Sequence, residues 1–240
     1  MPTRAQTRAA TQERIVAAAR SLVTAGNELT LRAVARELDM TAPALYRYAA
    51  SHQDLVKMVA LAIDADVAER VAGAAAAHPA EDPAARLIAA AVEFRTWALG
   101  NRAEFALVFT NVDVECISDL TATASTGMRF SELLFALWQQ VQFPIPALSD
   151  LDPQLAEIMR DPQVPADLTD VPEDMRGLVW VLERAWSRLY GTVTLETFGH
   201  IDPRVVAQGH LFRAMVNDQA GPLGLEPDLP RLTALLDELL

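Results

Sequence analysis

The sequence predicts an all-α fold, with a small N-terminal helix-turn-helix domain over residues 1–57 and a larger helical bundle over residues 58–240. Apolar residues recur every three or four positions along most of the 240-residue chain, and no segment sustains the alternation typical of a β-strand. Clusters of glycine and proline separate these periodic stretches. Long helices with short connections indicate a helical bundle.

Each periodic stretch predicts one helix. The first follows the spacing of Ile15, Ala18 and Leu22, and the clearest of the later ones follows an apolar stripe from Phe130 to Val141. In chain order, the predicted helices span residues 11–25, 31–38, 42–48, 52–77, 84–100, 102–110, 125–143, 173–199, 203–218 and 229–240. The stretch 144–172 holds six of the fourteen prolines and five aspartates. We interpret it as an irregular acidic surface loop with a short helix at 155–160.

Composition excludes several classes of protein. A single cysteine rules out a disulfide scaffold, and the four histidines are too far apart in sequence for a typical zinc motif. We therefore expect no metal and no cofactor. The first fourteen residues lack an apolar run, and no stretch of about 20 apolar residues follows. We expect a soluble, cytoplasmic protein that has no membrane partner.

Charge is distributed unevenly along the chain. The net charge of −12 argues against a protein that coats nucleic acid with its whole surface. Residues 1–57, however, carry eight basic and five acidic side chains, whereas the rest of the chain is strongly acidic. A basic head on an acidic body indicates that only the head contacts a polyanion.

The stretch from residue 29 to residue 59 carries the most informative motif. Thr30 is a favourable N-cap for one short helix, and Thr41 with Pro43 is favourable for the start of a second. Two such helices, joined by a tight turn and apolar on their inner sides, form a helix-turn-helix. The second helix is small and polar on its outer side, so its backbone can approach base edges while tyrosine hydroxyls reach phosphates. A structural helical hairpin in an all-α enzyme is the alternative.

This motif resembles the DNA-binding head of the TetR family of bacterial transcriptional regulators. The resemblance covers residues 11–59 and rests on Thr30, Val34, Ala35, Leu38, Thr41, the run ALYRY from Ala44 to Tyr48, Ser51, Asp54 and Leu55. It implies a head of three helices, with the helix at 42–48 in the major groove and a fourth helix that leads to a ligand-binding body. The implied DNA-binding residues are Thr30, Arg32, Thr41, Ala42, Pro43, Ala44, Tyr46, Tyr48 and His52.

A few residues of the head depart from the family pattern or precede it. Asp39 stands in place of a turn glycine, and aspartate tolerates positive φ better than most residues. Ala49 replaces a frequent aromatic residue. His52 replaces a phosphate-binding lysine, so we expect its contact with a DNA phosphate to be weaker and sensitive to pH. Equal operator affinity at pH 6 and pH 8 would contradict this expectation. Arg4 and Arg8 form either an arm into the minor groove or a disordered tail.

The helix predicted at 173–199 is apolar on two faces, which indicates packing on both sides. Gly191 within it costs up to about 1 kcal/mol relative to alanine, so we expect another helix to approach closely. The sequence from Trp180 to His200 resembles the WHG-type ligand-binding body of one TetR branch, loosely over residues 90–220. The resemblance implies a two-fold dimer interface formed by Trp180, Arg184, Ser187, Gly191, Thr194, Phe198, Val205, Gly209, Phe212 and Val216. A monomer in which the glycines serve intramolecular packing is the alternative.

Large side chains on separate helices of the body are candidates for a ligand pocket. They are Trp97, Phe105, Phe109, Met128, Leu134, Trp138 and Trp186. Effector cavities are mostly apolar with a few polar anchors. The candidate anchors are Asn111, Asp113, Glu115, Arg184 and His200. The same aromatic stripe is also typical of an ordinary helical core.

Together these observations favour a ligand-responsive transcriptional repressor that is not an enzyme. Such a homodimer binds double-stranded DNA at a palindromic operator, and a small, mostly apolar effector shifts it to a state with low DNA affinity. Two alternatives stay open. One is an all-α enzyme acting on an apolar substrate, for which no catalytic motif is found. The other is a helical adaptor that has lost DNA binding, in line with the departures at Ala49 and His52.

Overall fold

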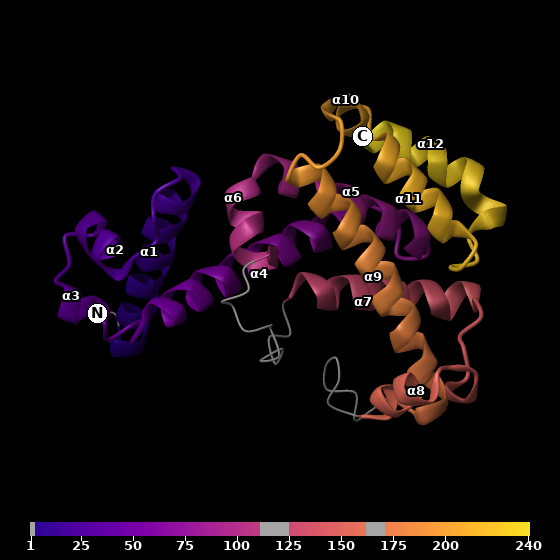
Figure 1. The fold of residues 1–240 in the computed structure, drawn as a ribbon, viewed down its shortest axis with the longest axis horizontal. Helices are drawn as coiled ribbons and strands as arrows, with labels where there is room; N and C mark the ends of the chain where they lie inside the picture. The colour runs from indigo at the N-terminus through magenta and orange to yellow at the C-terminus, as the bar shows by residue number, and fades with distance from the viewer. Residues whose placement is uncertain (1–2, 111–124, 162–170) are drawn as a thin grey trace. The chain divides into compact units, whose positions relative to one another are not determined.

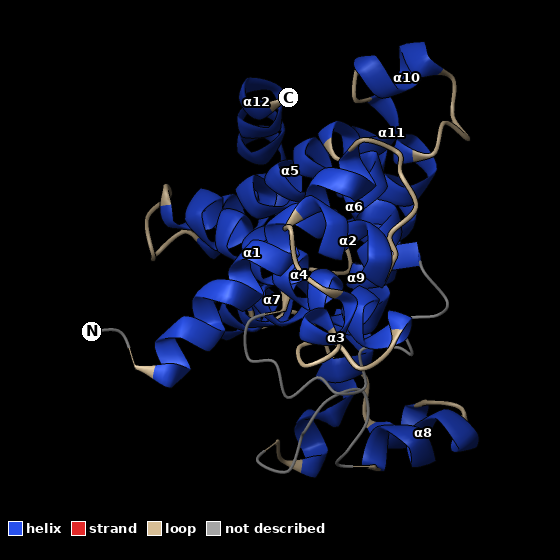
Figure 2. Ribbon diagram, turned by 90° about the vertical axis from the view of Figure 1, so that its left-hand side faces the viewer, coloured by secondary structure: helices blue, strands red, loops and turns tan. Residues whose placement is uncertain are grey.

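A computed structural model describes residues 3–110, 125–161 and 171–240. The described residues form helices and connecting loops without a β-strand (Figure 1, Figure 2), so the all-α prediction is confirmed. No helix in these ranges is long and apolar enough to cross a membrane. They divide into two compact units, one of residues 3–66 and 100–110 and the other of residues 67–99 with those described from 125 onward. This division differs from the boundary expected at residues 57 and 58.

The first unit is built around the helix-turn-helix. Its elements are α1 (Arg4–Thr24), α2 (Leu31–Glu37), α3 (Ala42–Leu45), the first part of α4 (His52–Ala76), α6 (Arg102–Phe105) and the π-helical turn η1 (Ala106–Thr110). Their inner sides meet in an apolar core whose fully buried members include Ile15, Val34, Leu45, Leu55 and Val59. Burial of these side chains stabilises the unit because each removes apolar area from water.

Helix α1 begins earlier than the sequence predicted. The Thr3 hydroxyl accepts a hydrogen bond from the Gln6 N–H, and the Gln6 side chain accepts one from the Thr3 N–H, which forms a capping box. Arg4 and Arg8 therefore lie in regular helix. The expectation of an arm or a disordered tail at these residues was wrong, because the cap at Thr3 extends the helix over them.

A charge cluster ties α6 to the N-terminal helices. Arg20 on α1 donates from Nε to Glu104 Oε1 at 2.7 Å and from Nη2 to Glu104 Oε2 at 3.1 Å, and it also pairs with Asp66 on α4. The hydrogen bond that Arg20 donates to Glu104 is the main cause that raises the pKa of Arg20 above its ordinary value. The Glu104 side chain is nearly buried. The pairing explains why residues 100–110 belong to the first unit although they are distant in sequence.

The second unit is a bundle around the long helix α9, which packs against α7, α8 and α11 (Figure 1). Its elements are the last part of α4, α5 (Pro83–Gly100), α7 (Thr126–Val141), η2 (Leu148–Asp150), α8 (Pro153–Arg160), η3 (Glu173–Met175), α9 (Arg176–Thr197), α10 (Pro203–Ala207), α11 (His210–Ala220), η4 (Glu226–Asp228) and α12 (Leu229–Leu239). Phe94, Phe130 and Trp186 meet at the centre, with ring centroids 5.4–5.9 Å apart. Contact among these rings joins α5, α7 and α9.

A buried ion pair holds the carboxyl end of α9 to α5. Arg95 Nε donates to Glu196 Oε2 at 2.6 Å, and Arg95 Nη2 donates to the Val206 carbonyl at 2.6 Å. The guanidinium also lies 5.4 Å from the ring centroid of Phe212. Through these contacts Arg95 connects α5 with α9, with α10 and with the first turn of α11.

One prediction about secondary structure was wrong in this unit. The helix expected over 203–218 is interrupted because Gly209 adopts φ +64°, which ends one helix and starts the next. The short helix expected at 155–160 is confirmed as α8, which begins at Pro153 and packs with η2 and the first turn of α9 through Leu148, Ala156, Met159 and Val179. Residues 162–170 of the expected acidic loop lie outside the described residues.

Candidate nucleic-acid interface and a separate apolar pocket

The turn between α2 and α3 sets the geometry of the helix-turn-helix. Asp39 adopts φ 51°, which confirms that aspartate takes the positive φ expected at this position. The Met40 N–H donates to the Ala35 carbonyl at 2.8 Å and closes the end of α2. Leu45 is fully buried and anchors α3 to the core. The opposite side of α3 is thereby turned outward.

The outer side of this segment carries the predicted base-facing residues. Thr41 and Pro43 are exposed, Ala42 and Ala44 are half-buried, and α3 itself ends at residue 45. The side chain of Thr41 makes no capping hydrogen bond to the helix that it starts. These short side chains permit close approach of another surface, and the threonine hydroxyl offers a donor and two acceptor positions.

The tyrosines flank this surface. Tyr46 exposes 52% of its area, and Tyr48 is half-buried. The Arg8 guanidinium lies 5.2 Å from the Tyr48 ring centroid, and its Nη2 donates to the Arg47 carbonyl at 3.5 Å. This cation–π contact braces the end of the α3 segment from α1.

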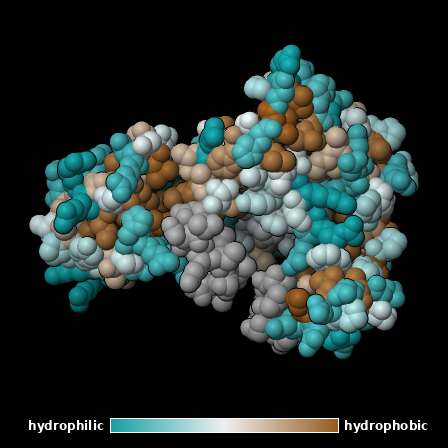
Figure 3. Space-filling model, in the orientation of Figure 1, coloured by the Kyte–Doolittle hydropathy of each residue, from teal (hydrophilic) through white to brown (hydrophobic). Residues whose placement is uncertain are grey.

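Exposed arginines lie on α2 and directly after α3. Arg32, Arg36 and Arg47 are exposed, and none of them forms an ion pair with any residue in the described ranges. Figure 3 shows that hydrophilic residues dominate the outer rim of the first unit in this view. Arg36 and Arg47 were missed by sequence reasoning, although both are arginines on the polar side of the motif. Their charges have no acidic partner among the described residues and can contact phosphates.

Thr30 and His52 are engaged with the local backbone. The Thr30 hydroxyl accepts the Ala33 N–H at 3.1 Å and caps α2. His52 Nε2 lies 2.7 Å from the Leu29 carbonyl, which joins the start of α4 to the residues before α2. Thr30 thus caps α2, and His52 connects the start of α4 to the residue before Thr30.

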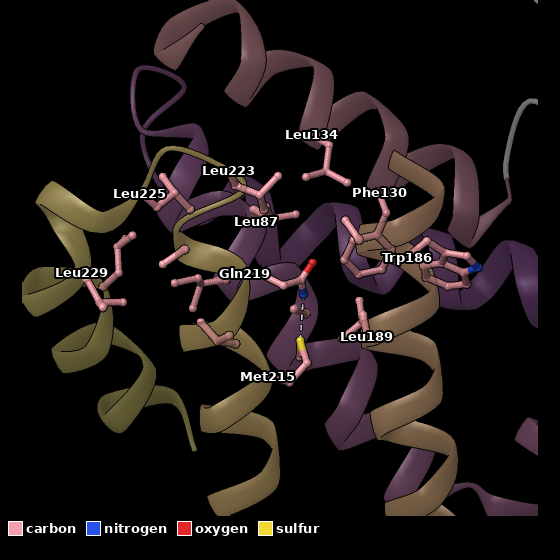
Figure 4. Close-up of a pocket in the computed structure, with 16 residues that line it drawn as sticks. Leu87, Phe130, Leu134, Trp186, Leu189, Met215, Gln219, Leu223, Leu225 and Leu229 are labelled. Carbon is pink, nitrogen blue, oxygen red and sulfur yellow. Dashed lines mark hydrogen bonds between the residues drawn. The ribbon is translucent and has the colours of Figure 1, made fainter. Parts of the chain in front are cut away.

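A pocket lies within the second unit, between α5, α7, α9, α11 and α12 (Figure 4). The pocket opens to solvent, and the protein encloses only part of its space of about 640 Å³. Its lining is formed by Leu87, Ile88, Ala91, Phe130, Leu134, Ala185, Trp186, Leu189, Met215, Val216, Gln219, Ala220, Leu223, Leu225, Leu229 and Leu232. None of these described lining residues is charged. The arrangement suits a mainly apolar molecule.

The structure brings only part of the predicted pocket together. Leu134 and Trp186 line it, whereas Trp97, Phe105, Phe109, Met128 and Trp138 do not. Phe105 and Phe109 pack against each other in the first unit, with ring centroids 5.1 Å apart. Trp97 is buried beside Phe94, and Trp138 stacks on the exposed Phe135.

None of the expected polar anchor residues that the structure describes lines the pocket, and several lining residues near the C-terminus were not expected from the sequence. Arg184 and His200 are exposed, and Asn111, Asp113 and Glu115 lie outside the described residues. Sequence reasoning missed Gln219 and the lining from residues 223–232. The spacing of Leu229, Leu232 and Leu236 on α12 was an available signal for an inward apolar face.

Helix α9 presents two different faces. Leu178, Ala185, Leu189 and Val193 are buried in the unit. The other predicted face is exposed or half-buried at each of its positions, which are Trp180, Arg184, Ser187, Gly191, Thr194 and Phe198. A Cβ added at Gly191 meets no described atom within 4 Å. The helix that was expected to approach Gly191 is therefore not supplied by the described part of this chain.

The interface residues expected on the helices after α9 are buried or half-buried within this chain. Phe212 is fully buried in the chain, and Gly209 is buried at the break between α10 and α11. Val216 lines the pocket, and Val205 on α10 is half-buried. The break at Gly209 rotates α11, so its exposed residues are His210, Ala214, Asn217 and Asp218.

Comparison with known proteins matches both parts of the chain. Residues 15–59 match the family model for bacterial regulatory proteins of the tetR family, and residues 87–219 match the model for a tetracyclin repressor-like C-terminal domain. HTH-type transcriptional regulators of Mycobacterium bovis and Mycobacterium tuberculosis are 36% identical to it over 81 residues, which is 34% of this chain and 35% of each relative. The chain thus spans about a third of the length of the curated relatives it matches.

Proposed function

Because the chain belongs to the TetR family of bacterial regulatory proteins, we propose that it is a ligand-responsive transcriptional repressor. In this proposal a homodimer binds a palindromic operator through α3 of each subunit. A small, mostly apolar effector binds the second unit and lowers the affinity for DNA. The effector achieves this by binding the low-affinity state more tightly than the DNA-bound state.

The observation that carries the DNA-binding role is the surface around α3. Short and hydroxyl side chains at Thr41 to Ala44 are flanked by Arg32, Arg36 and Arg47, which lack acidic partners among the described residues. Small side chains let the helix backbone approach base edges, and neighbouring cations can bind phosphates. An adaptor or an enzyme of the same fold would not need these arginines to bind phosphates.

The proposed dimer rests on the outer face of α9. This face combines the half-buried Phe198 with the open position at Gly191, and its Trp180 is also half-buried because it packs against the cluster of Leu148, Ala156, Met159 and Val179. A glycine in mid-helix is unfavourable, and an approaching helix from a second subunit compensates for it. A two-fold dimer also provides the two recognition helices that a palindromic site requires.

The experiment that tests the proposal is selection of binding sites from a pool of random DNA duplexes. We expect the enriched sequences to contain an inverted repeat whose half-sites lie about one helical turn apart. Their affinity should fall steeply with salt, because phosphate contacts release counterions. Enrichment of no sequence at low salt would contradict the proposal and favour the adaptor that has lost DNA binding.

A further inference from the structure

The lining of the pocket in the second unit disfavours ligands that carry a charge. Its described lining residues are aliphatic and aromatic apart from the amide of Gln219. A carboxylate or an ammonium group entering this space would lose its hydration and find no opposite charge there. Burial of an unpaired charge is strongly unfavourable.

Gln219 supplies the pocket with hydrogen-bonding groups. Its Nε2 donates to Met215 Sδ at 2.8 Å, and its carboxamide lies near the middle of the ring of lining side chains (Figure 4). A thioether is a weak acceptor, so a ligand oxygen can replace it as the partner of this amide. The amide oxygen is also available to accept a hydrogen bond from a ligand hydroxyl.

We propose that this pocket binds an uncharged, mainly apolar molecule that carries one hydroxyl or carbonyl group, and that Gln219 recognises this group. Trp186 and Leu189 of α9 contact the apolar part from one side, and α12 contacts it from the other. The inference rests on the proposed role of this unit as the effector-binding part of the protein. It adds the chemical class of the effector and the residue that determines its selection.

The test compares three probes of equal chain length, decan-1-ol, decanoate and decylammonium, by calorimetry on the full chain without DNA. We expect decan-1-ol to bind at least about tenfold more tightly than either charged probe. Spectra of protein labelled at the methionine methyl groups should show a shift of the Met215 signal, which assigns binding to this pocket. Binding of no probe, or equal binding of a charged probe, would overturn the inference.

A substitution isolates the contribution of the amide. Gln219→Leu keeps the size of the side chain and should weaken decan-1-ol about two- to tenfold, while the affinity of 1-chlorodecane, which lacks the hydroxyl, stays the same or rises. Gln139→Leu makes the same change on the exposed side of α7 and should alter neither affinity. An unchanged affinity of Gln219→Leu for decan-1-ol would refute recognition by Gln219. Because no DNA is present, these results are independent of the site-selection experiment.

Discussion

Gly177 lies at the start of α9 directly beside the carbonyl of Pro146, where only a hydrogen atom fits. A Cβ built at Gly177 would overlap the Pro146 carbonyl oxygen, which is backbone and cannot rotate away. This contact fixes the chain that enters the α8 region against the long helix. It is a residue-scale constraint that the sequence did not reveal, since nothing in the local pattern distinguishes this glycine from one that is merely tolerated.

Gly177→Ala should therefore destabilise the protein by about 1–3 kcal/mol through overpacking. Gly73→Ala is the control, because a Cβ at that exposed position of α4 meets no described atom within 4 Å. It should stabilise the protein by up to about 1 kcal/mol through helix propensity. Urea unfolding of both variants measures the difference, and equal stability would contradict the close contact.

Residue-scale prediction succeeded where the chemistry is local. Asp39 was expected to take positive φ because of its own side chain, and it does. Gln219 and Arg47 were missed for a different reason. Their roles depend on which way a helix faces after packing, and a single sequence does not contain that rotation.

At the scale of whole helices, the buried ion pair between Arg95 and Glu196 connects α5 to α9. Burial raises the pKa of Glu196, and the guanidinium of Arg95 opposes this effect. The side chains are 8% and 0% exposed, respectively. Removal of the cation would leave a buried carboxylate without its main partner, which typically costs about 3–5 kcal/mol.

Arg95→Met should lower the free energy of unfolding by an amount in this range at pH 7. A folded-state pKa above the unfolded value means that stability is lost as the pH rises through it. The deficit relative to the native protein should therefore shrink at pH 5, where the orphaned Glu196 can take up a proton. Arg70→Met breaks the exposed pair with Glu93 and should cost at most about 1 kcal/mol at either pH. A deficit for Arg95→Met that does not change between the two pH values would count against this account.

Most helices were predictable because periodic burial and breaker residues mark them in sequence. The errors have local backbone causes that the apolar periodicity does not show. The capping box at Thr3 extends α1, and the positive φ of Gly209 divides an expected helix. Ile158 of α8 is 50% exposed.

The described residues combine a head that carries exposed charges with a bundle in which one face of α9 is exposed or half-buried. Each unit has its own apolar core. The proposed function requires two copies, since a single α3 segment covers only one half-site. Dimerisation through α9 is therefore the property of the assembly that most needs a test of its own.

Gly191→Leu should weaken the dimer without unfolding the chain. The leucine has room at its Cβ within one subunit, whereas a helix of a second subunit packed there would be pushed away. Sedimentation velocity should show a rise of at least about fivefold in the dimer dissociation constant, with helical content unchanged. Gly73→Leu is the matched control on α4, and an equal effect of both substitutions would locate the interface elsewhere.

The most direct measurement of the central claim is the affinity of Thr41→Glu for the selected palindrome. An acidic residue is favourable at the start of a helix, and Thr41 makes no capping bond, so the fold should be unaffected. Gln154→Glu adds the same charge to the exposed first turn of α8 in the second unit. If α3 enters the groove, Thr41→Glu loses at least about tenfold in affinity through repulsion from phosphates, and Gln154→Glu changes it less than about twofold. Equal affinities of the two variants would show that α3 does not contact the DNA.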